Sequence, residues 1–248
     1  MSAARTEPTR GGLEGSAGGG GMGGMGGMGC WRGGWWWHAR RRPCANHGPR
    51  PGGAVVDLAI VHSISLPPGI YGGPEIEQFF GNRLDCDAHP YFHALKGVEV
   101  SAHFVIRRSG EVLQFVDCDR RAWHAGRSRW RGRDNCNDHS IGIELEGLEG
   151  DTFEPPQYAA LGRLLRALAR RYPLREVVGH EHVAPGRKGD PGAGFVWRAL
   201  RAALRRRRLW LIGDPPAKTR LTPRNRAPAR MDRGLREAAR TTVGALPG

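Results

Sequence analysis

The sequence has no run of about 18 consecutive apolar residues, the length that a helix needs to cross a bilayer. It also lacks the apolar segment of a secretory signal near its N-terminus, because Gly and Met dominate residues 1–33. Its five cysteines include no Cys-x-x-Cys pair, and the odd number fits a reducing compartment better than a disulfide framework. We therefore expect a cytoplasmic protein with no membrane span.

The positive charge is concentrated at one end of the chain. The 248 residues carry a formal net charge of +14, which by itself favours nucleic acid as a partner. However, residues 201–248 contribute +10 of that charge, and residues 34–200 contribute only +3. A Trp triplet at 35–37 followed by an Arg triplet at 40–42 could stack on bases and contact phosphates, but we expect one or two of these Trp to pack against the domain. We do not expect nucleic acid to bind the central region.

Composition divides the chain into three parts. Residues 1–33 hold thirteen Gly and are expected to be a disordered leader, because they cannot bury enough apolar surface to offset the entropy of ordering. Residues 34–207 have ordinary composition and are expected to form a single domain, acting as a monomer. Residues 208–248 contain several Pro and scattered Arg, which predict a flexible basic tail.

Strand and helix patterns alternate through the central part. Residues 140–146 alternate with period two and place Glu144 and Glu146 on the face opposite to three apolar side chains. Leu residues between 158 and 168 follow helical spacing, with Arg on the other side. Further elements are predicted as strands at 55–61 and 177–178, a hairpin at 100–116, a short helix from 74 and a last helix at 195–207. These elements predict an α/β fold with a mixed central β-sheet flanked by helices.

Two histidines follow predicted strands and so lie where α/β folds tend to place sites. His62 comes directly after residues 55–61, and His180 follows the strand at 177–178. Between Pro185 and Pro191 no helix can form, so we expect an extended segment with Lys188 and Asp190 on one side. Two imidazoles and a carboxylate give zinc three ligands and leave a fourth position open. No compact spacing such as His-Glu-x-x-His enforces this site. Each histidine alone is more often a hydrogen-bonded core residue.

Several short segments, in order from residue 34 to 204, resemble a known family. They are similar to the zinc-dependent N-acetylmuramoyl-L-alanine amidases, which share their fold with peptidoglycan recognition proteins. The segments that carry the resemblance are His62 to Gly69, Val100-Ser101-Ala102-His103, Arg121-Ala122-Trp123-His124-Ala125-Gly126, Cys136 to Gly147, Gly179-His180 and Arg187 to Gly192.

The resemblance implies a role for each matching residue. His62, His180 and Asp190 correspond to the zinc ligands, Glu144 to the general base and Lys188 to the residue that stabilises the developing oxyanion. Other branches of the family have Cys at the third ligand or Tyr at the base. Asp and Glu at these positions are typical of the cytosolic branch, which hydrolyses the amide bond between anhydro-N-acetylmuramic acid and L-alanine in muropeptides during peptidoglycan recycling. The expected cofactor is Zn²⁺, and the expected partner is an anhydro-muropeptide.

Some nearby residues are open alternatives. Glu146 shares a strand face with Glu144 and competes for the base, although the resemblance favours Glu144. His103 and His124 are candidates for contacts behind the ligands or with substrate, or ordinary buried polar residues. His182 stands two residues from His180 and is a weak candidate ligand.

Three residues are candidates for binding the substrate. Trp123 could stack on the sugar or the peptide, although a core Trp is nearly as good an interpretation. Arg133 and Asn137 could meet the carboxylates of the peptide, and the alternative is a solvated loop.

Three other functions are alternatives to the amidase. A noncatalytic peptidoglycan-binding module of the same fold is expected to lack a ligand or the base, and here all five residues are present. A nucleic-acid-binding protein would depend on the basic tail. An exported amidase acting on intact wall is opposed by the missing export signal.

Overall fold

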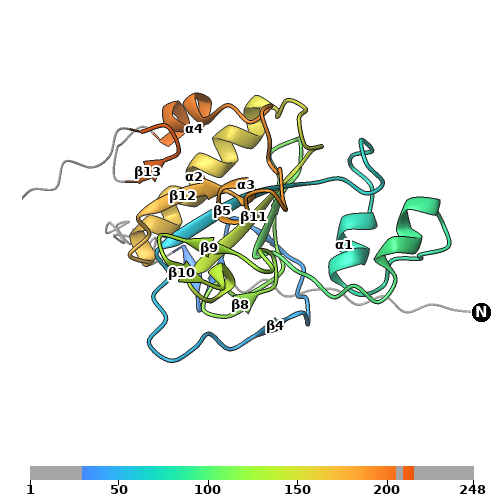
Figure 1. The fold of residues 1–248 in the computed structure, drawn as a ribbon, viewed down its shortest axis with the longest axis horizontal. Coiled ribbons are helices and arrows are strands. Elements are labelled where there is room, and N and C mark those ends of the chain that lie inside the picture. The colour runs from blue at the N-terminus through green and yellow to red at the C-terminus, as the bar shows by residue number, and fades with distance from the viewer. Residues whose placement is uncertain (1–29, 205–208, 215–248) are drawn as a thin grey trace, which may run out of the picture. The chain divides into compact units, whose positions relative to one another are not determined.

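A seven-stranded mixed sheet forms the centre of the protein (Figure 1). The computed structural model describes residues 30–204 and 209–214. All neighbours in the sheet pair in parallel except β6 and β7, which form an antiparallel hairpin. In order across the sheet, the strands are β13 (Trp210–Leu211), β12 (Glu176–Gly179), β5 (Leu58–Ile64), β11 (Ser140–Glu146), β6 (Phe104–Ile106), β7 (Val112–Gln114) and β3 (Arg40–Arg41).

Two helices cover one face of the sheet, as Figure 1 shows. Helix α2 (Pro155–Arg171) packs its leucines against the sheet, and α4 (Trp197–Leu204) packs beside α2. The apolar side chains that alternate along β11 point toward this layer, together with Ala59 and Val61 of β5. The other face of these strands carries Glu144 and His62, so the packing of the core directs both side chains away from the helices.

Loops and short elements cover the opposite face. Leu58, Ile60 and Val178 pack there against the loop containing Ala125 and against α3 (His180–Val183). The remaining short elements of this layer and of the N-terminal part are β1 (Trp31–Arg32), β2 (Trp35–Trp36), β4 (His47–Gly48), β8 (Arg121–Ala122), β9 (Arg129–Trp130), β10 (Arg133–Asp134) and the 3-10 helix η2 (Cys136–Asp138).

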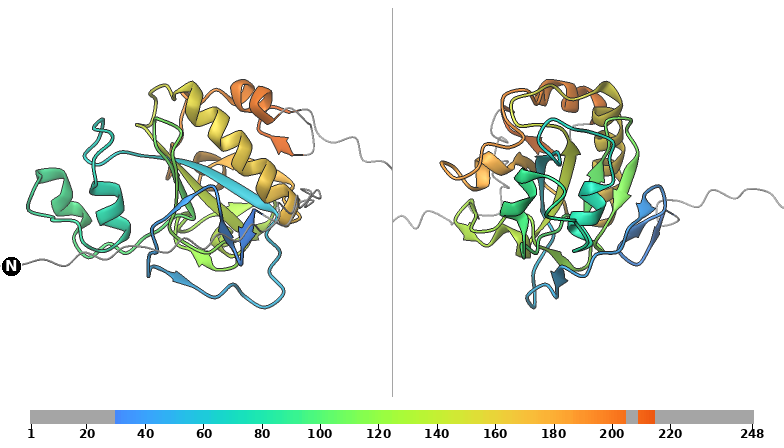
Figure 2. Two further views of the ribbon diagram at one scale, coloured as in Figure 1. Left: turned by 180° about the vertical axis from the view of Figure 1, so that it is seen from behind. Right: turned by 90° about the vertical axis from the view of Figure 1, so that its right-hand side faces the viewer.

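Helix α1 (Glu75–Phe80) and the 3-10 helix η1 (Pro90–Leu95) lie together at one end of the sheet (Figure 2). Their apolar side chains form a second core with Val105, Leu113 and Phe115 of the hairpin region. This arrangement places Phe79 and Phe80 beside the end of β5, where they line the same cavity as His62 and Ile64.

The predicted mixed sheet flanked by helices is confirmed, but the bounds of some predicted segments differ from the structure. The strand predicted at 55–61 runs from Leu58 to Ile64, because pairing with β11 continues to the Ile64–Glu146 position. Strand β1 lies inside the expected leader, and β13 lies inside the expected tail. Both form because a neighbouring strand offers unpaired hydrogen-bonding groups. The rest of the leader and of the tail, residues 1–29 and 215–248, falls outside the described residues.

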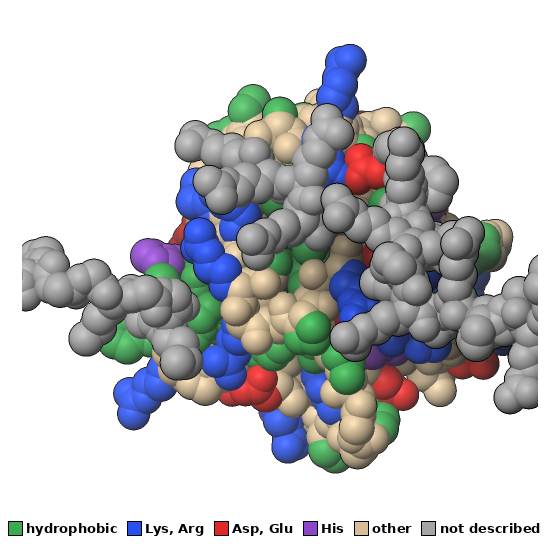
Figure 3. Space-filling model, turned by 90° about the vertical axis from the view of Figure 1, so that its left-hand side faces the viewer, with side chains coloured by type: hydrophobic (Ala, Val, Ile, Leu, Met, Phe, Trp, Pro, Cys, Tyr) green, Lys and Arg blue, Asp and Glu red, His purple; other side chains and the backbone are tan. Residues whose placement is uncertain are grey.

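The surface agrees with a nearly balanced domain. Figure 3 shows Lys and Arg side chains on one face with acidic side chains among them. Ion pairs such as Arg131–Glu176 and Arg133–Asp57 neutralise part of this charge. Of the Trp triplet, Trp36 is buried in the main core, as expected, and Trp37 is exposed. In the part of the chain that the structure describes, no helix is both long and apolar enough to cross a membrane.

Candidate active site

Two buried imidazoles and a carboxylate meet at the end of the sheet. Strand β12 pairs in parallel with β5, placing Gly179 beside Val61, so His180 follows directly next to His62. The two Nδ1 atoms are 3.0 Å apart, and each lies 3.2 Å from Oδ2 of Asp190. The ligand atoms of the three residues all lie within 4.8 Å of one another. The structure therefore brings His62, His180 and Asp190 together as one group that could hold a metal ion.

The hydrogen bonds of His180 show which ring nitrogen is free. Its Nε2 lies 3.1 Å from the carbonyl oxygen of Ala125, which can only accept, so Nε2 carries the proton. In the neutral ring, Nδ1 then offers a lone pair toward His62 and Asp190. Acceptors that converge in this way can ligate a cation placed between them. Ligands held at about 2.0–2.1 Å from a tetrahedral zinc stand roughly 3.3 Å apart, so the observed spacing and donor set fit zinc.

Burial sets the charges of these groups. Desolvation lowers the pKa of His62 to about 4, and the hydrogen bond with Asp190 offsets this only in part. Although burial raises the pKa of Asp190, its close contacts with the two histidines hold this pKa well below its ordinary value. The site thus presents a neutral His62 and an ionised carboxylate at neutral pH, which are the forms that ligate metals.

Glu144 lies beside this group on the neighbouring strand. It is the register partner of His62 across the parallel β5–β11 pair, so both side chains leave the same face of the sheet. Burial, and then the nearby Asp190 carboxylate, raise the pKa of Glu144 well above its ordinary value, whereas Lys188 lowers it. A carboxylate of this kind can take up a proton at neutral pH, as a general base must.

The competing carboxylate, Glu146, is fully engaged elsewhere. One oxygen accepts a hydrogen bond from Arg107 Nη1 at 2.7 Å and another from the Gly72 amide at 2.8 Å. The second oxygen accepts from the Arg108 amide at 3.1 Å. Glu146 is therefore held in a buried ion pair and does not line the cavity that Glu144 faces. This geometry favours Glu144 as the base.

A cavity of about 490 Å³ opens over the three converging residues. Glu144, Lys188 and Trp123 are among the residues that line it. Lys188 is exposed and follows a turn at Pro185–Arg187. The amides of Arg187 and Lys188 both donate hydrogen bonds to the carbonyl oxygen of Ala184. The prediction of an extended segment between Pro185 and Pro191 is therefore wrong. The opposite wall is apolar and consists of Leu66, Phe79, Phe80, Tyr91 and Leu95.

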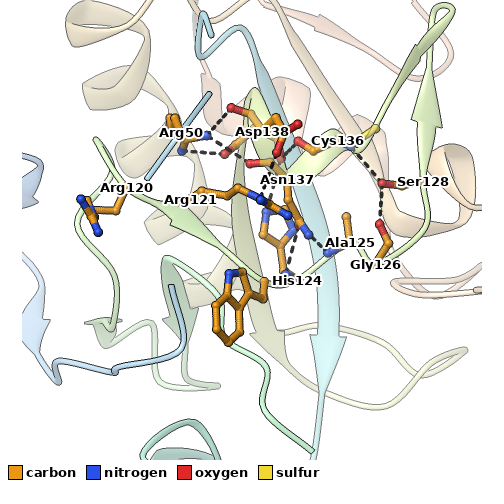
Figure 4. A network of polar contacts seen from close by, with 12 residues as sticks. Arg50, Arg120, Arg121, His124, Ala125, Gly126, Ser128, Cys136, Asn137 and Asp138 are labelled. Carbon is orange, nitrogen blue, oxygen red and sulfur yellow. Dashed lines mark hydrogen bonds and ion pairs between the residues drawn. The ribbon is translucent and has the colours of Figure 1, made fainter. Parts of the chain in front are cut away.

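Arg133 and Asn137 do not reach this cavity. Arg133 forms an ion pair with Asp57 at 2.9 Å. The Asn137 Oδ1 accepts hydrogen bonds from the amides of His124 and Ala125, at 3.2 and 2.8 Å, which fixes the loop behind the site (Figure 4). Short polar side chains often bond to nearby backbone in this way, and the sequence motif alone could not show it.

The other candidate histidines lie around the site in different roles. His124 lines the cavity and its Nδ1 lies 3.0 Å from His62 Nε2. His103 is buried farther back, where its Nδ1 accepts from the Gly142 amide at 3.0 Å. His182 accepts from the Gly179 amide and does not belong to the group that could hold a metal.

Arg50 is a residue of the site region that the sequence did not indicate. Its guanidinium is largely buried and donates to the carbonyl oxygens of Cys118, Asn137, Asp138 and Ser140, at 2.9 to 3.2 Å. It thereby joins the N-terminal segment to η2 and to the start of β11 (Figure 4). A single Arg in a Pro- and Gly-rich stretch gave no signal of this, because its partners are backbone groups far along the chain.

The end of the sheet thus gathers His62, His180 and Asp190, which could hold a metal ion, beside the buried Glu144, and this donor set suits hydrolysis. Residues 52–193 match the family model of N-acetylmuramoyl-L-alanine amidases, and the chain belongs to this family. It is 47% identical over 171 residues to the 1,6-anhydro-N-acetylmuramyl-L-alanine amidase AmpD of Citrobacter freundii. The aligned region covers 68% of this chain and 91% of that protein.

Two further relatives agree with this assignment. AmpD of Escherichia coli K12 is 46% identical over 170 residues, covering 68% of this chain and 93% of the relative. A crystal structure of a selenomethionine derivative of AmpD superimposes with a TM-score of 0.67 at 46% identity, covering 70% of this chain and 98% of the other. The protein is thus an N-acetylmuramoyl-L-alanine amidase.

Proposed function

We propose that the protein is a zinc-dependent amidase that hydrolyses the bond between anhydro-N-acetylmuramic acid and L-alanine in muropeptides during peptidoglycan recycling. The observation that carries the proposal is the convergence of His62 Nδ1, His180 Nδ1 and Asp190 beside the buried Glu144. The choice of an anhydro sugar is supported by the names of the AmpD relatives, which cover most of the domain. The zinc requirement is supported by the donor set and its spacing.

The residues of the chain divide the reaction between them. His62, His180 and Asp190 would hold the zinc ion, which as a Lewis acid would lower the pKa of a water molecule. Glu144 accepts the proton of the attacking water as the oxygen–carbon bond forms, and later donates it to the nitrogen when the carbon–nitrogen bond breaks. Lys188 lines the same cavity and donates a hydrogen bond to the negative oxygen of the tetrahedral intermediate. The reaction consumes one water and one amide, and the proton taken from the water ends on the leaving amine, so no further reactant is needed.

We place this activity in the cytoplasm, as the sequence predicts. All five cysteines are free, and three of them are buried. Thiols in this state are normal in a reducing compartment.

The decisive experiment compares metal states and substrates. Purified protein is assayed on an anhydro-muropeptide and on intact sacculi, first as isolated, then after chelation, and then with zinc restored. We expect cleavage of the anhydro-muropeptide to disappear with chelation and to return with zinc. Release of peptide that is unaffected by complete metal removal would contradict the zinc requirement, and preference for sacculi would contradict the substrate assignment.

Lys188→Ala is expected to lower kcat by about a hundredfold or more, because one oxyanion donor contributes roughly 3 kcal/mol. Zinc affinity should stay unchanged, since the Lys188 side chain is exposed and is not part of the metal-binding group. Steady-state kinetics and metal titration separate the two quantities. Arg187→Ala is a matched control, because the neighbouring Arg187 also lines the cavity but its guanidinium is committed to the carbonyls of Ala125 and Arg127. If Lys188→Ala retains full kcat, the oxyanion role is wrong.

A further inference from the structure

We propose that His124 and Ser140 form an ordered hydrogen-bond chain that fixes the tautomer of His62, leaving its Nδ1 unprotonated toward the cavity. This inference rests on the proposed metal site and assigns positioning residues behind it. Three hydrogen bonds link the Cys136 carbonyl, Ser140, His124 and His62, and the direction of each bond follows from the one before.

The direction of the chain is set at its far end. The hydroxyl of Ser140 lies 2.6 Å from the carbonyl oxygen of Cys136, which cannot donate, so Ser140 gives its only proton to this oxygen. Ser140 therefore offers a lone pair to Nε2 of His124, 3.3 Å away. Both Ser140 and Cys136 are completely buried, so water does not compete for these groups. Nε2 of His124 must then carry the proton.

The same logic continues through His124 to the ligand. A neutral imidazole with its proton on Nε2 has an acceptor at Nδ1. Nδ1 of His124 lies 3.0 Å from Nε2 of His62, so His62 must donate from Nε2. Its Nδ1 then holds a lone pair, and this is the atom 3.0 Å from His180 Nδ1 and 3.2 Å from Asp190. The carbonyl oxygen of Cys136 thus determines, through three hydrogen bonds, that Nδ1 is the nitrogen of His62 that is free to bind a metal.

The fold holds His124 in the place that this chain requires. Gly142 of β11 leaves the space, because a Cβ there would lie 2.3 Å from the His124 ring. The amide of His124 is fixed by Asn137 Oδ1, and the carbonyl of Asn137 is held in turn by Arg50 at 3.2 Å. Figure 4 shows His124 with Asn137 and Arg50 in this network. Gly142 on the sheet and the side-chain amide of Asn137 therefore hold the His124 ring in one orientation.

The chain predicts a loss of metal affinity when its acceptor is removed. Groups that orient a metal-ligating histidine typically contribute about 10- to 100-fold in affinity. His124→Leu should weaken zinc binding by about this factor, because His62 is then free to carry its proton on Nδ1. His124→Asn is nearly the same size as Leu but has an acceptor where Nδ1 stands, and should recover most of the loss. Ser140→Ala, the smallest change, should give a smaller loss in the same direction.

The test has two independent measurements. Zinc dissociation constants are obtained by competition with a chromophoric chelator for the wild type and the three variants. Nitrogen NMR of the metal-free protein then reports which ring nitrogen of His62 carries the proton. His103→Leu is the matched control, because His103 is a buried, hydrogen-bonded histidine that packs next to His124 but does not touch a ligand residue. It should lose stability while the folded protein keeps its zinc affinity and its His62 tautomer.

The outcomes distinguish this inference from the proposed function. A wild type that binds no zinc would contradict the proposed metal site, and the NMR measurement would still test the chain. A proton on Nδ1 of His62 in the metal-free wild type would overturn the inference. Equal zinc affinity of His124→Leu and the wild type would also overturn it. A shift of the His62 tautomer in Ser140→Ala, with none in His103→Leu, would support it, because a general loss of packing does not move a single proton.

Discussion

Glu144→Gln is expected to lower kcat by about a hundred- to ten-thousand-fold, which is the usual contribution of a positioned general base. Gln has nearly the same shape as Glu but cannot accept the proton of the attacking water. The ligand group is complete without this side chain, so zinc should remain bound. Steady-state kinetics, together with metal analysis of the same preparation, check both parts of the prediction. A variant with normal kcat would place the base elsewhere.

Glu146→Gln provides the matched control on the same strand. The two glutamates are two residues apart and face the same side of β11, but Glu146 forms a buried ion pair with Arg107. Breaking such a pair leaves an uncompensated buried charge, so the free energy of unfolding should fall by about 3 kcal/mol. The kcat of the folded fraction should remain near that of the wild type. Glu144→Gln is thus expected to lose activity, and Glu146→Gln is expected to lose stability.

The effect of Glu144→Gln on stability depends on pH. Because the pKa of Glu144 is raised on folding, the folded metal-free protein binds this proton more tightly than the unfolded chain does. The carboxyl therefore contributes stability below its unfolded pKa of about 4.3, and this contribution is lost as pH rises. Metal-free Glu144→Gln should be more stable than the wild type at neutral pH, and the difference should vanish below about pH 4. Thermal unfolding of both proteins across this range measures it.

The sequence predicted those parts of the site that depend on local patterns. Period-two alternation placed Glu144 and Glu146 on one face, and the structure confirms this. The pattern could not show which of them faces the cavity, because Arg107, which engages Glu146, comes from the hairpin region rather than from β11. Distant pairing of this kind has no local signal.

Side chains that bond to backbone were also hidden from the sequence. Asn137 stands in a family-like segment, but its amide oxygen accepts from two backbone amides, those of His124 and Ala125, which lie 13 and 12 residues earlier in the chain. Strand β13 contains two residues and has no period to detect, and it forms because Leu209 and Leu211 are buried beside β12. In each case the missing information is the tertiary neighbour, not the propensity of the segment.

Asp190→Ala is expected to abolish both tight zinc binding and measurable amidase activity. The side chain supplies the only carboxylate of the ligand group among the residues that the structure describes, and removing it leaves two imidazoles. The loop itself should persist, because the Asp190 carbonyl accepts a hydrogen bond from the Glu181 amide at 2.9 Å, independently of the side chain. Metal titration and circular dichroism on the same sample separate loss of the ligand from loss of the fold.

Replacing Asp190 by two other residues tests whether charge or shape matters at this position. Asp190→Asn preserves the shape but removes the negative charge, so zinc affinity should fall steeply. Asp190→Cys restores an anionic ligand, and the longer zinc–sulfur bond of about 2.3 Å partly compensates for the shorter side chain. We expect Asp190→Cys to bind zinc more tightly than Asp190→Asn and to retain part of the activity. The reverse order would show that residue 190 acts by hydrogen bonding to His62 and His180 rather than by binding the metal.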